Sequence, residues 1–389
     1  MVDGLQVRVV GAGIAGLAAA LAWSQSGASV HLWEKASSIK EVGAGLQISP
    51  NGLAVLSRLG LKDEVVNISD RAEAVDLCDS KEGKLVCRLD LKTHAPDLDF
   101  LLVHRADLIR TLFQACKAQG VRFAFSQKLT SQNLLSGDFG GEAAPGPVDL
   151  VVGADGVRSN MRTALLGPSA PFFTGQVAWR ALVPNSMDHP NKVMVHIGPR
   201  RHIVSYPLRG GSLVNLVMVQ ERSLWASEGW SHRDDPTHVR AAFADFGGLA
   251  RMLLSAISDV YLWGLFCHSV SQHWFRDRSV LIGDAAHPML PFLAQGANMA
   301  LEDAWVLNRA LLLHGTTQQG FKHYQSLRQP RVQKVIATAQ SNARNYHLSA
   351  PITRWVAHSA LRGLGLIAPS AVLKRFDWLY RFDPDTGLP

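Results

Sequence analysis

Two apolar runs near the start of the chain, separated by small residues, predict a βαβ unit. Residues 5–10 (LQVRVV) are apolar apart from Gln6 and Arg8, as expected for a buried parallel strand, and residues 14–26 combine small and apolar residues as a buried helix does. A second strand-like run, ASVHLWE, ends at Glu34. The segment GAGIAG therefore lies on the turn from the first strand to the helix.

The pattern further along the chain predicts a second, differently built region. Between about 175 and 270, short runs alternate apolar and polar residues, as in the strands of a half-buried antiparallel sheet, with a polar helical insert near 231–247. Elsewhere the pattern predicts helices over 50–59 (capped by Ser49 with Pro50 in the first turn), 106–118, 296–313 and 318–347, and strands at VRFAF, VDLVVGADG and RSVLIGDAA.

These elements predict an α/β protein with a discontinuous Rossmann-like βαβ domain, a second, mostly antiparallel sheet domain and C-terminal helices. We expect the first domain to comprise residues 1–70, 100–174 and 271–315, and the second to comprise 71–99 and 175–270, with a helical segment over 316–389.

Composition narrows the function classes. The 39 Lys and Arg against 32 Asp and Glu give a net charge of +7 that is scattered along the chain, which argues against a nucleic-acid partner and suits an anionic cofactor or substrate. The four cysteines form no CxxC or CxxxxC pair, so no zinc site, disulfide framework or disulfide-reductase chemistry is expected.

Hydropathy argues against a membrane protein. No run of 18 apolar residues and no secretory signal pattern occurs, so a cytoplasmic protein is expected. The apolar tail WVAHSALRGLGLIAPSAVLKRFDWLY (355–380) is expected mainly to pack into the core, with membrane or partner contact as the alternative.

The glycines of GAGIAG match a dinucleotide-binding fingerprint. Gly11 allows the tight turn, Gly13 lets the backbone approach a pyrophosphate, and Gly16 lets the helix lie close to the strand, while the helix N-terminus attracts phosphate. Glu34, about 20 residues later, can accept hydrogen bonds from ribose hydroxyls.

Two further motifs follow in order: Asp155-Gly156 in GADGVRS, and Gly283-Asp284 in IGDAAHPMLPFLAQGANMALEDA. Together with GAGIAG and Glu34 they resemble the single-component FAD-dependent aromatic hydroxylases, the group that includes para-hydroxybenzoate hydroxylase. The resemblance spans nearly the whole chain. It implies that FAD is reduced by NADH or NADPH and reacts with O2 to give a flavin C4a-hydroperoxide, which hydroxylates an electron-rich ring.

The resemblance also assigns cofactor contacts. Asp284 would bind the ribityl hydroxyls of FAD, with a helix-capping Asp as the alternative, and Arg105 in HRADL would reach toward FAD, with a surface Arg as the alternative. Asp155 would lie near FAD and the nicotinamide, unless it only forms a turn. Gly296, Ala297 and Asn298 would stabilise negative charge on the flavin from a helix start.

The substrate side rests on His202 and Tyr206. Four residues apart in RRHIVSYPL, they point to the same face of a strand. Their pattern resembles that of the salicylate, 3-hydroxybenzoate and 6-hydroxynicotinate hydroxylase branch, in which His and Tyr face the substrate ring; packed core side chains are the alternative. His has a suitable pKa range for accepting a phenol proton. Gln47 and Pro291 are further candidates to line the pocket.

The expected function is hydroxylation of a phenolic aromatic acid by a monomer or homodimer, the nicotinamide cofactor remaining open. A larger apolar substrate, a nicotinamide dehydrogenase and a flavoprotein that only binds are the alternatives. Arg180, Arg200 and Arg201 are candidates to attract a substrate carboxylate, but the sequence leaves open which of them face inward.

Overall fold

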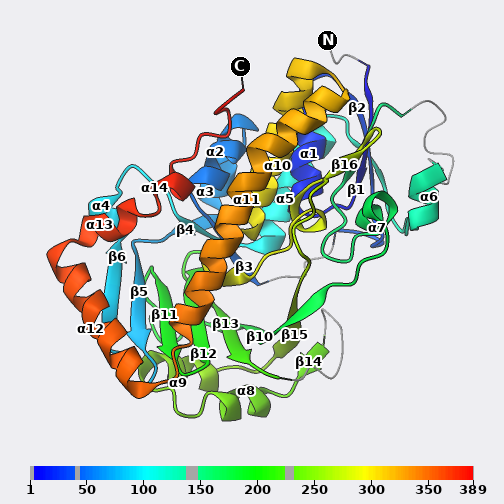
Figure 1. The fold of residues 1–389 in the computed structure, drawn as a ribbon. Helices are drawn as coiled ribbons and strands as arrows, with labels where there is room; N and C mark the ends of the chain where they lie inside the picture. The colour runs from blue at the N-terminus through cyan, green and yellow to red at the C-terminus, as the bar shows by residue number, and fades with distance from the viewer. Residues whose placement is uncertain (1–3, 40–43, 137–147, 224–231, 389) are drawn as a thin grey trace.

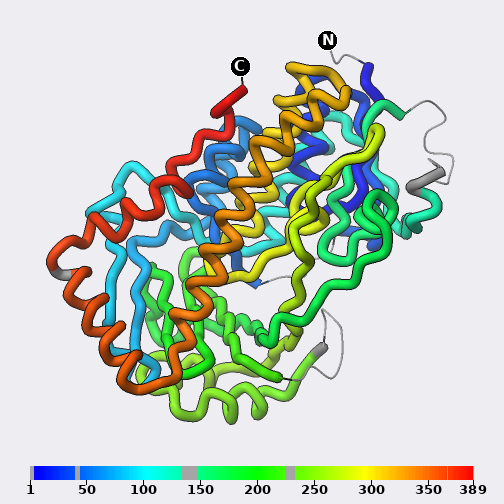
Figure 2. The backbone as a smooth tube through the Cα atoms, in the orientation of Figure 1, coloured from blue at the N-terminus to red at the C-terminus, as the bar shows by residue number. Residues whose placement is uncertain are grey.

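A computed structural model describes residues 4–39, 44–136, 148–223 and 232–388 (Figure 1). A six-stranded sheet with helices on its faces forms the upper body in this view, and an eight-stranded sheet forms the lower one. The long helix α11 (Gln318–Tyr346) runs along both, which the backbone trace shows clearly (Figure 2). This arrangement confirms the predicted fold class.

The six-stranded sheet has the order β16-β17-β9-β1-β2-β8 and is parallel except for the β16–β17 hairpin. Its strands are β1 (Gln6–Val10), β2 (Ser29–Trp33), β8 (Arg122–Ala124), β9 (Leu150–Gly153), β16 (Phe275–Arg276) and β17 (Ser279–Leu281). The helix α1 (Ile14–Gln25) is buried over most of its length because α5 (Arg105–Ala118) and α10 (Gly296–His314) pack against it. The predicted βαβ unit is β1-α1-β2.

The eight-stranded sheet has the order β14-β15-β10-β13-β12-β11-β5-β6 and is antiparallel except where β11 pairs with β5. Its strands are β5 (Ala74–Asp79), β6 (Leu85–Asp90), β10 (Phe172–Pro184), β11 (Val193–Gly198), β12 (Arg201–Leu208), β13 (Leu213–Glu221), β14 (His232–Asp234) and β15 (Val260–Cys267). One face is covered by α8 (Pro236–Ala242) and α9 (Gly248–Ser255) through an apolar cluster that includes Ile203 and Phe243.

The other face of this sheet looks toward the first body. Between them lies a small antiparallel sheet, β3 (Gly45–Ile48), β7 (Leu101–His104) and β4 (Ser69–Arg71), whose strands β7 and β4 contact β12. Two short 3₁₀ turns, η1 (Gly283–Ala285) and η2 (Pro291–Leu293), link β17 to α10. The remaining helices are α2 (Pro50–Arg58), α3 (Lys62–Asn67), α4 (Leu91–His94), α6 (Ser131–Ser136), α7 (Asn160–Leu166), α12 (Pro351–Ile367), α13 (Pro369–Lys374) and α14 (Asp377–Tyr380).

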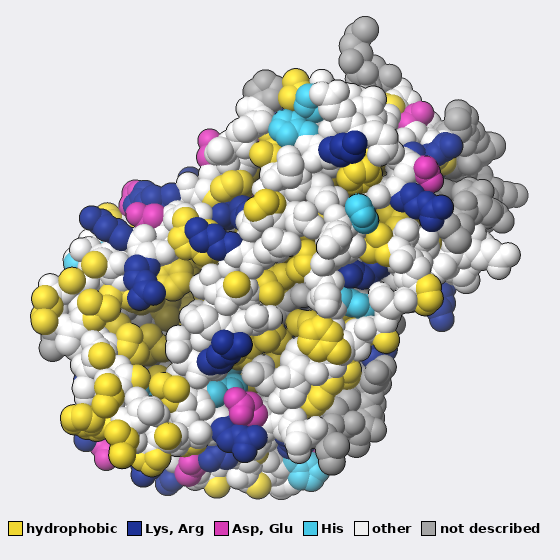
Figure 3. Space-filling model, in the orientation of Figure 1, with side chains coloured by type: hydrophobic (Ala, Val, Ile, Leu, Met, Phe, Trp, Pro, Cys, Tyr) yellow, Lys and Arg dark blue, Asp and Glu magenta, His cyan; other side chains and the backbone are white. Residues whose placement is uncertain are grey.

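The apolar tail departs from its expected burial. On α12, Trp355 is 70% exposed and Ile367 is 87% exposed, and hydrophobic side chains gather over this edge of the molecule (Figure 3). One side of the helix packs on β6, which leaves its other apolar side outside the core. No helix in the described part of the chain is long and apolar enough to cross a membrane.

Candidate active site

The glycines of the first turn divide into two structural roles. Gly11 has φ +105°, and a Cβ there would lie 2.4 Å from the carbonyl oxygen of Ala154. At Gly16 a Cβ would lie 1.9 Å from the Gly11 carbonyl oxygen, so both positions need glycine for the polypeptide to pack. Gly13 differs, because a Cβ there meets no described atom within 4 Å. Its open side is where a ligand can approach the start of α1.

Glu34 lies at the end of β2 beside this turn. Its carboxylate accepts hydrogen bonds from the backbone N–H groups of Ala12 (2.7 Å) and Ala36 (2.8 Å). These bonds hold the acid next to the open side of Gly13, the position that a ribose-binding carboxylate requires.

Asp155 lies against the same turn, and its carboxylate accepts hydrogen bonds from residues that follow it closely in the chain. Its Cα is 3.1 Å from the position of a Cβ on Gly11. The carboxylate accepts hydrogen bonds from the Ser159 hydroxyl and from the Met161 N–H (3.1 Å), which fixes the start of α7. Burial raises the pKa of Asp155, and the bond from Ser159 opposes that shift. The side chain thus makes the local bonds of a turn-forming Asp, and its place beside Gly11 is compatible with the predicted contact to a cofactor.

Asp284 and Arg105 lie near enough for their charges to influence each other. Asp284 is accessible to solvent on η1, while Arg105 is half-buried at the first turn of α5. The surrounding protein still raises the pKa of Asp284 by desolvation, whereas the charges of His287 and Arg105 lower it. The carboxylate of Asp284 is accessible, which is the feature that a ligand needs.

The start of α10 offers unpaired donors. The first intrahelical bond runs from Met299 N to the Gln295 carbonyl at 2.8 Å, so the N–H groups of Gly296, Ala297 and Asn298 have no partner within the helix. Gly296 and Ala297 are half-buried, and a Cβ on Gly296 meets nothing described within 4 Å. The Asn298 side chain already has hydrogen-bond partners within the protein. It donates to the carbonyl oxygens of Gln47 and Ala294 and accepts from the N–H of Ser49.

A buried ion network behind this turn escaped the sequence analysis. The Asp303 carboxylate accepts the Gly283 N–H (2.9 Å), lies 2.5 Å from His287 Nε2 and accepts from Arg328 Nε (2.7 Å). Neighbouring Glu302 bonds both Arg328 and Arg331. The only sequence signal was the pair Glu-Asp inside an apolar helix; the network holds the turn that presents Asp284.

The sheet face opposite η2 carries the predicted substrate residues. His202 and Tyr206 are both buried on β12, and the His202 ring lies 5.3 Å from the ring of Phe292, next to Pro291. The Tyr206 ring packs under the backbone of Gly45, where a Cβ would lie 2.6 Å from its Cε2. The predicted shared face of His202 and Tyr206 is therefore turned toward η2 and β3.

The pKa shifts of His202 and Tyr206 have the directions that burial produces. Desolvation, followed by the nearby His347, holds the pKa of His202 well below its usual value. Burial raises the pKa of Tyr206, and the charge of Arg180 opposes this shift. Both shifts favour the uncharged form of the side chain, the imidazole of His202 and the phenol of Tyr206.

Arg180 on β10 faces the same side of the sheet as His202, a question that the sequence left open. It pairs with Val217, which pairs with Val204 on β12, so Arg180 shares the face of His202 and Tyr206. Its guanidinium lies 4.6 Å from the Trp263 ring centroid, and none of the residues described here hydrogen-bonds to it. Burial lowers the pKa of Arg180, and the charge of Arg105 lowers it further.

Gln47 and Pro291 lie at the edges of this space. Gln47 is half-buried on β3, opposite Leu102, and Pro291 is half-buried at the start of η2.

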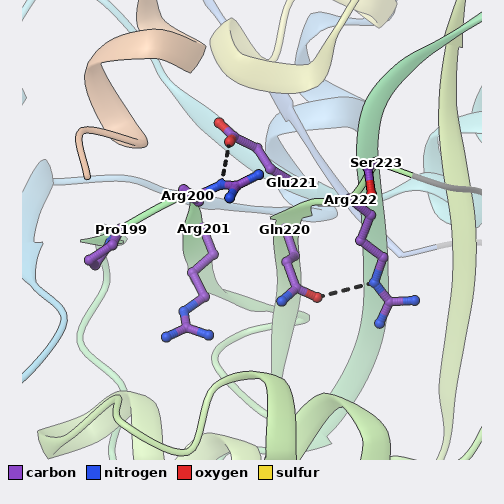
Figure 4. A pocket seen from close by; sticks show the side chains of 7 residues that line it. All are labelled: Pro199, Arg200, Arg201, Gln220, Glu221, Arg222 and Ser223. Carbon is purple, nitrogen blue, oxygen red and sulfur yellow. Dashed lines mark hydrogen bonds and ion pairs between the residues drawn. The ribbon is translucent and has the colours of Figure 1, made fainter. Parts of the chain in front are cut away.

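Two surface hollows lie elsewhere. One is lined by residues of the β11–β12 turn and the end of β13, including Arg200, Arg201 and Glu221 (Figure 4), and the other lies beside α12. Arg201 bonds Asp245, so neither it nor Arg200 faces the substrate side.

The arrangement fits FAD. Gly13 leaves room for a pyrophosphate, and Glu34 supplies a carboxylate suited to the adjoining ribose. The accessible Asp284 suits ribityl hydroxyls, and the unpaired N–H donors of Gly296 and Ala297 suit acceptor atoms of the ring. Among the described residues no group of His, Cys, Asp and Glu could hold a metal ion, and all four cysteines are free.

Comparisons with known proteins agree with this fit. Residues 4–339 match the family model described as an FAD binding domain. The chain is 36% identical to a 3-amino-4-hydroxybenzoate 2-monooxygenase of Streptomyces cremeus over 90% of this chain and 89% of the relative. It is 31% identical to a 3-hydroxybenzoate 6-hydroxylase of Klebsiella oxytoca over 99% and 98%, respectively. The solved salicylate hydroxylase substrate complex has the same fold, with a TM-score of 0.80 at 24% identity over 99% of this chain and 97% of that one.

Proposed function

We propose, since the chain belongs to the family of FAD-dependent aromatic monooxygenases, that its substrate is a phenolic aromatic acid, hydroxylated with NADH or NADPH and O2. The relatives named for aminohydroxybenzoate and hydroxybenzoate support a ring that carries both a hydroxyl and a carboxylate. Bound FAD supplies the redox chemistry and activates oxygen. The protein must hold the ring, ionise its hydroxyl and exclude water.

The observation that carries the proposal is the unpaired guanidinium of Arg180 on the face of His202. Arg180 is half-buried, and its Nε is shielded from solvent without a hydrogen-bond partner among the described residues, so the guanidinium is available to an anion from outside the chain. Arg180 and His202 stand two strands and two residues apart, which places their backbones about 12 Å from each other. On this face an aromatic acid would lie with its carboxylate at Arg180 and its ring hydroxyl toward His202.

Each residue then has a defined task. Arg180 binds the carboxylate while its stacking on Trp263 fixes the plane of the guanidinium. The ring lies over the apolar side chains of Val204 and Val217, which separate the two polar ends. His202 accepts the proton of the ring hydroxyl, because a phenolate is a better nucleophile than a phenol. Tyr206 stands beside Arg180 and can donate its hydroxyl hydrogen to the substrate.

The cofactor side follows from the same geometry. Asp284 and the N–H groups of Gly296 and Ala297 would hold FAD, and η2 with Pro291 and Phe292 would close the space between cofactor and His202. Phe292 and Leu293 make this closure apolar, which keeps water from the reacting ring.

The test is oxidation of NADH and of NADPH by the FAD-loaded protein with hydroxybenzoates, aminohydroxybenzoates, salicylate, hydroxynicotinates and larger phenols. We expect one class of phenolic acid to accelerate flavin reduction and to gain one oxygen by mass spectrometry. Hydroxylation only of substrates without a carboxylate would overturn the proposal in favour of a larger apolar substrate.

A further inference from the structure

Two side chains, His347 and Glu221, link the buried His202 to the protein surface. His202 Nδ1 lies 2.8 Å from His347 Nε2, and His347 Nδ1 lies 2.9 Å from Glu221 Oε1. The His202 and His347 residues are 2% and 5% exposed, whereas the Glu221 side chain is 31% exposed. Glu221 lines the surface hollow of Figure 4 and pairs there with Arg200 at 3.0 Å. The chain of hydrogen bonds therefore runs from the proposed substrate pocket to solvent.

The backbone holds this chain in place from two sides. His347 directly follows α11, and its carbonyl accepts the N–H of Arg200 at 3.2 Å. The Glu221 N–H in turn donates to the Arg200 carbonyl at 2.9 Å. The end of α11 is thus fastened to the β11–β12 turn at the point where the side chains meet.

The carboxylate at the outer end fixes the direction of every hydrogen bond. Ionised Glu221 only accepts, so His347 carries its proton on Nδ1 and presents a bare Nε2. His202 must then donate from Nδ1, which leaves its Nε2 bare. None of the described residues hydrogen-bonds to Nε2 of His202, the atom left to meet a substrate hydroxyl.

We propose that His202, His347 and Glu221 form a proton relay that carries the proton of the substrate hydroxyl out to the surface hollow. The relay rests on the proposed function, because it requires a phenolic substrate at His202. His202 is its catalytic member, and His347 and Glu221 act through it.

The transfer balances without an added reactant. The substrate O–H bond breaks with its electron pair left on oxygen, and the proton joins Nε2 of His202. The Nδ1 proton of His202 passes to Nε2 of His347, whose own Nδ1 proton passes to Glu221 and then to water. Both rings end neutral with their protons exchanged between nitrogens, and the reverse transfer restores them when the oxygen is reprotonated.

Burial explains why a relay is needed. Desolvation lowers the pKa of both histidines, most strongly at His202, so an imidazolium is costly at either position. A lone buried base would have to keep the substrate's proton as a charge. Exchange of tautomers avoids this cost, because no ring carries a net charge once the transfer is complete.

The first test does not depend on turnover. Histidine-selective ¹⁵N spectra of the FAD-loaded protein at pH 7, assigned with His202→Gln and His347→Gln, report which nitrogen carries the proton. We expect neutral rings protonated at Nδ1 in both residues, and loss of this preference in Glu221→Ala. A ring protonated at Nε2, or an imidazolium, would overturn the relay.

The second test uses chemical rescue. Glu221→Ala should slow hydroxylation about 10- to 100-fold, and formate entering the vacated place should restore the rate in a saturable way with KM unchanged. The matched control is Asp245→Asn, because Asp245 pairs with Arg201 beside the same hollow and contacts neither histidine. It should keep the wild-type rate.

The outcomes separate the two proposals. If the wild-type protein hydroxylates a phenolic acid and Glu221→Ala does so equally fast, or is slowed without rescue by formate, the relay is wrong while the function stands. If the wild-type protein hydroxylates no phenolic acid, the proposed function is wrong, and the tautomers still decide whether the hydrogen-bond chain has the proposed direction.

Discussion

The guanidinium of Arg180 lies 4.6 Å from the centroid of the Trp263 ring, on the sheet face that also carries His202. Stacking holds the cation without using its N–H donors, so these stay available to a ligand. Strand pairing fixes the distance from this cation to the histidine. The proposed function uses both residues, with the substrate carboxylate at Arg180 and its ring hydroxyl at His202.

Arg180→Met should raise KM for aromatic acids about 10- to 100-fold, because hydrogen bonds to a charged group are lost from a buried site. Steady-state kinetics with the acid and with its amide or methyl ester would check this, since the variant should discriminate less between them. Arg222→Met is the control: Arg222 also stacks on a tryptophan, Trp179, but beside the surface hollow. Equal effects of both substitutions would contradict the carboxylate role.

Gly13→Ala should give a folded protein that does not retain FAD. A methyl group there meets no described protein atom, and Gly13 has an ordinary φ of −78°, so the chain tolerates it. The same methyl group would occupy the space needed by the pyrophosphate. Flavin absorbance after purification and the thermal midpoint of the apoprotein would test both parts.

Gly16→Ala is the matched comparison. Its Cβ would lie 1.9 Å from the Gly11 carbonyl oxygen, so we expect destabilisation of about 3 kcal/mol or more by overpacking. A Gly13→Ala protein that binds FAD normally would contradict the assignment of the open side of the turn to the cofactor.

Asp284→Ala and Asp303→Ala should separate binding from folding. Asp284 is accessible and makes no hydrogen bond to the described residues, so its loss should lower FAD occupancy and leave apoprotein stability near that of wild type. Asp303 is fully buried and bonds Gly283, His287 and Arg328. Its removal leaves Arg328 with one fewer counter-charge and should cost about 3–5 kcal/mol.

Urea unfolding of the apoproteins, together with flavin content, would measure the two effects. Full flavin content in Asp284→Ala would contradict its role at the cofactor, and unchanged unfolding of Asp303→Ala would contradict the structural role of the network.

How far the sequence could predict this site depends on whether the determinants are local. The turn from β1 to α1 follows from GAGIAG because adjacent residues determine it, and the shared face of His202 and Tyr206 follows from the period of a strand. The face of Arg180 depends on pairing with β13, and the bond from His202 to His347 joins residues 145 positions apart. No local pattern encodes either relationship.

The burial of the apolar tail was predicted only in part, for a related reason. Leu373 and Leu379 lie in the core as expected, whereas Trp355 and Ile367 on α12 are exposed. Hydropathy predicted that residues 355–380 would mainly pack into the core, but burial depends on what lies opposite, and only one side of α12 meets β6. For Asp155 the sequence motif predicted its position at a strand-to-helix turn. The motif could not predict the hydrogen bonds that its carboxylate accepts from Ser159 and Met161, because these depend on the geometry of the turn. The predicted domain limits and the choice between NADH and NADPH stay predictions.

Acid should destabilise the protein through His196. This ring is fully buried, neither nitrogen has a hydrogen-bond partner among the described residues, and burial lowers its pKa to about 4, with His189 lowering it further and Asp79 opposing. The unfolded chain binds a proton near pH 6.5, whereas the folded chain stays neutral until about pH 4. Stability from this group is therefore complete above pH 6.5 and falls by about 3 kcal/mol as the pH drops to 4.

His196→Leu should flatten this dependence, since leucine fills a similar volume and does not titrate. Urea midpoints between pH 7 and 4.5 would show it. His238→Ala is the control with the opposite sign: the hydrogen bond to Asp234 raises the pKa of exposed His238, so its contribution is present below pH 6.5 and is lost as the pH rises through the raised value. An unchanged pH dependence in His196→Leu would mean that His196 takes up a proton in the folded state as easily as in the unfolded chain.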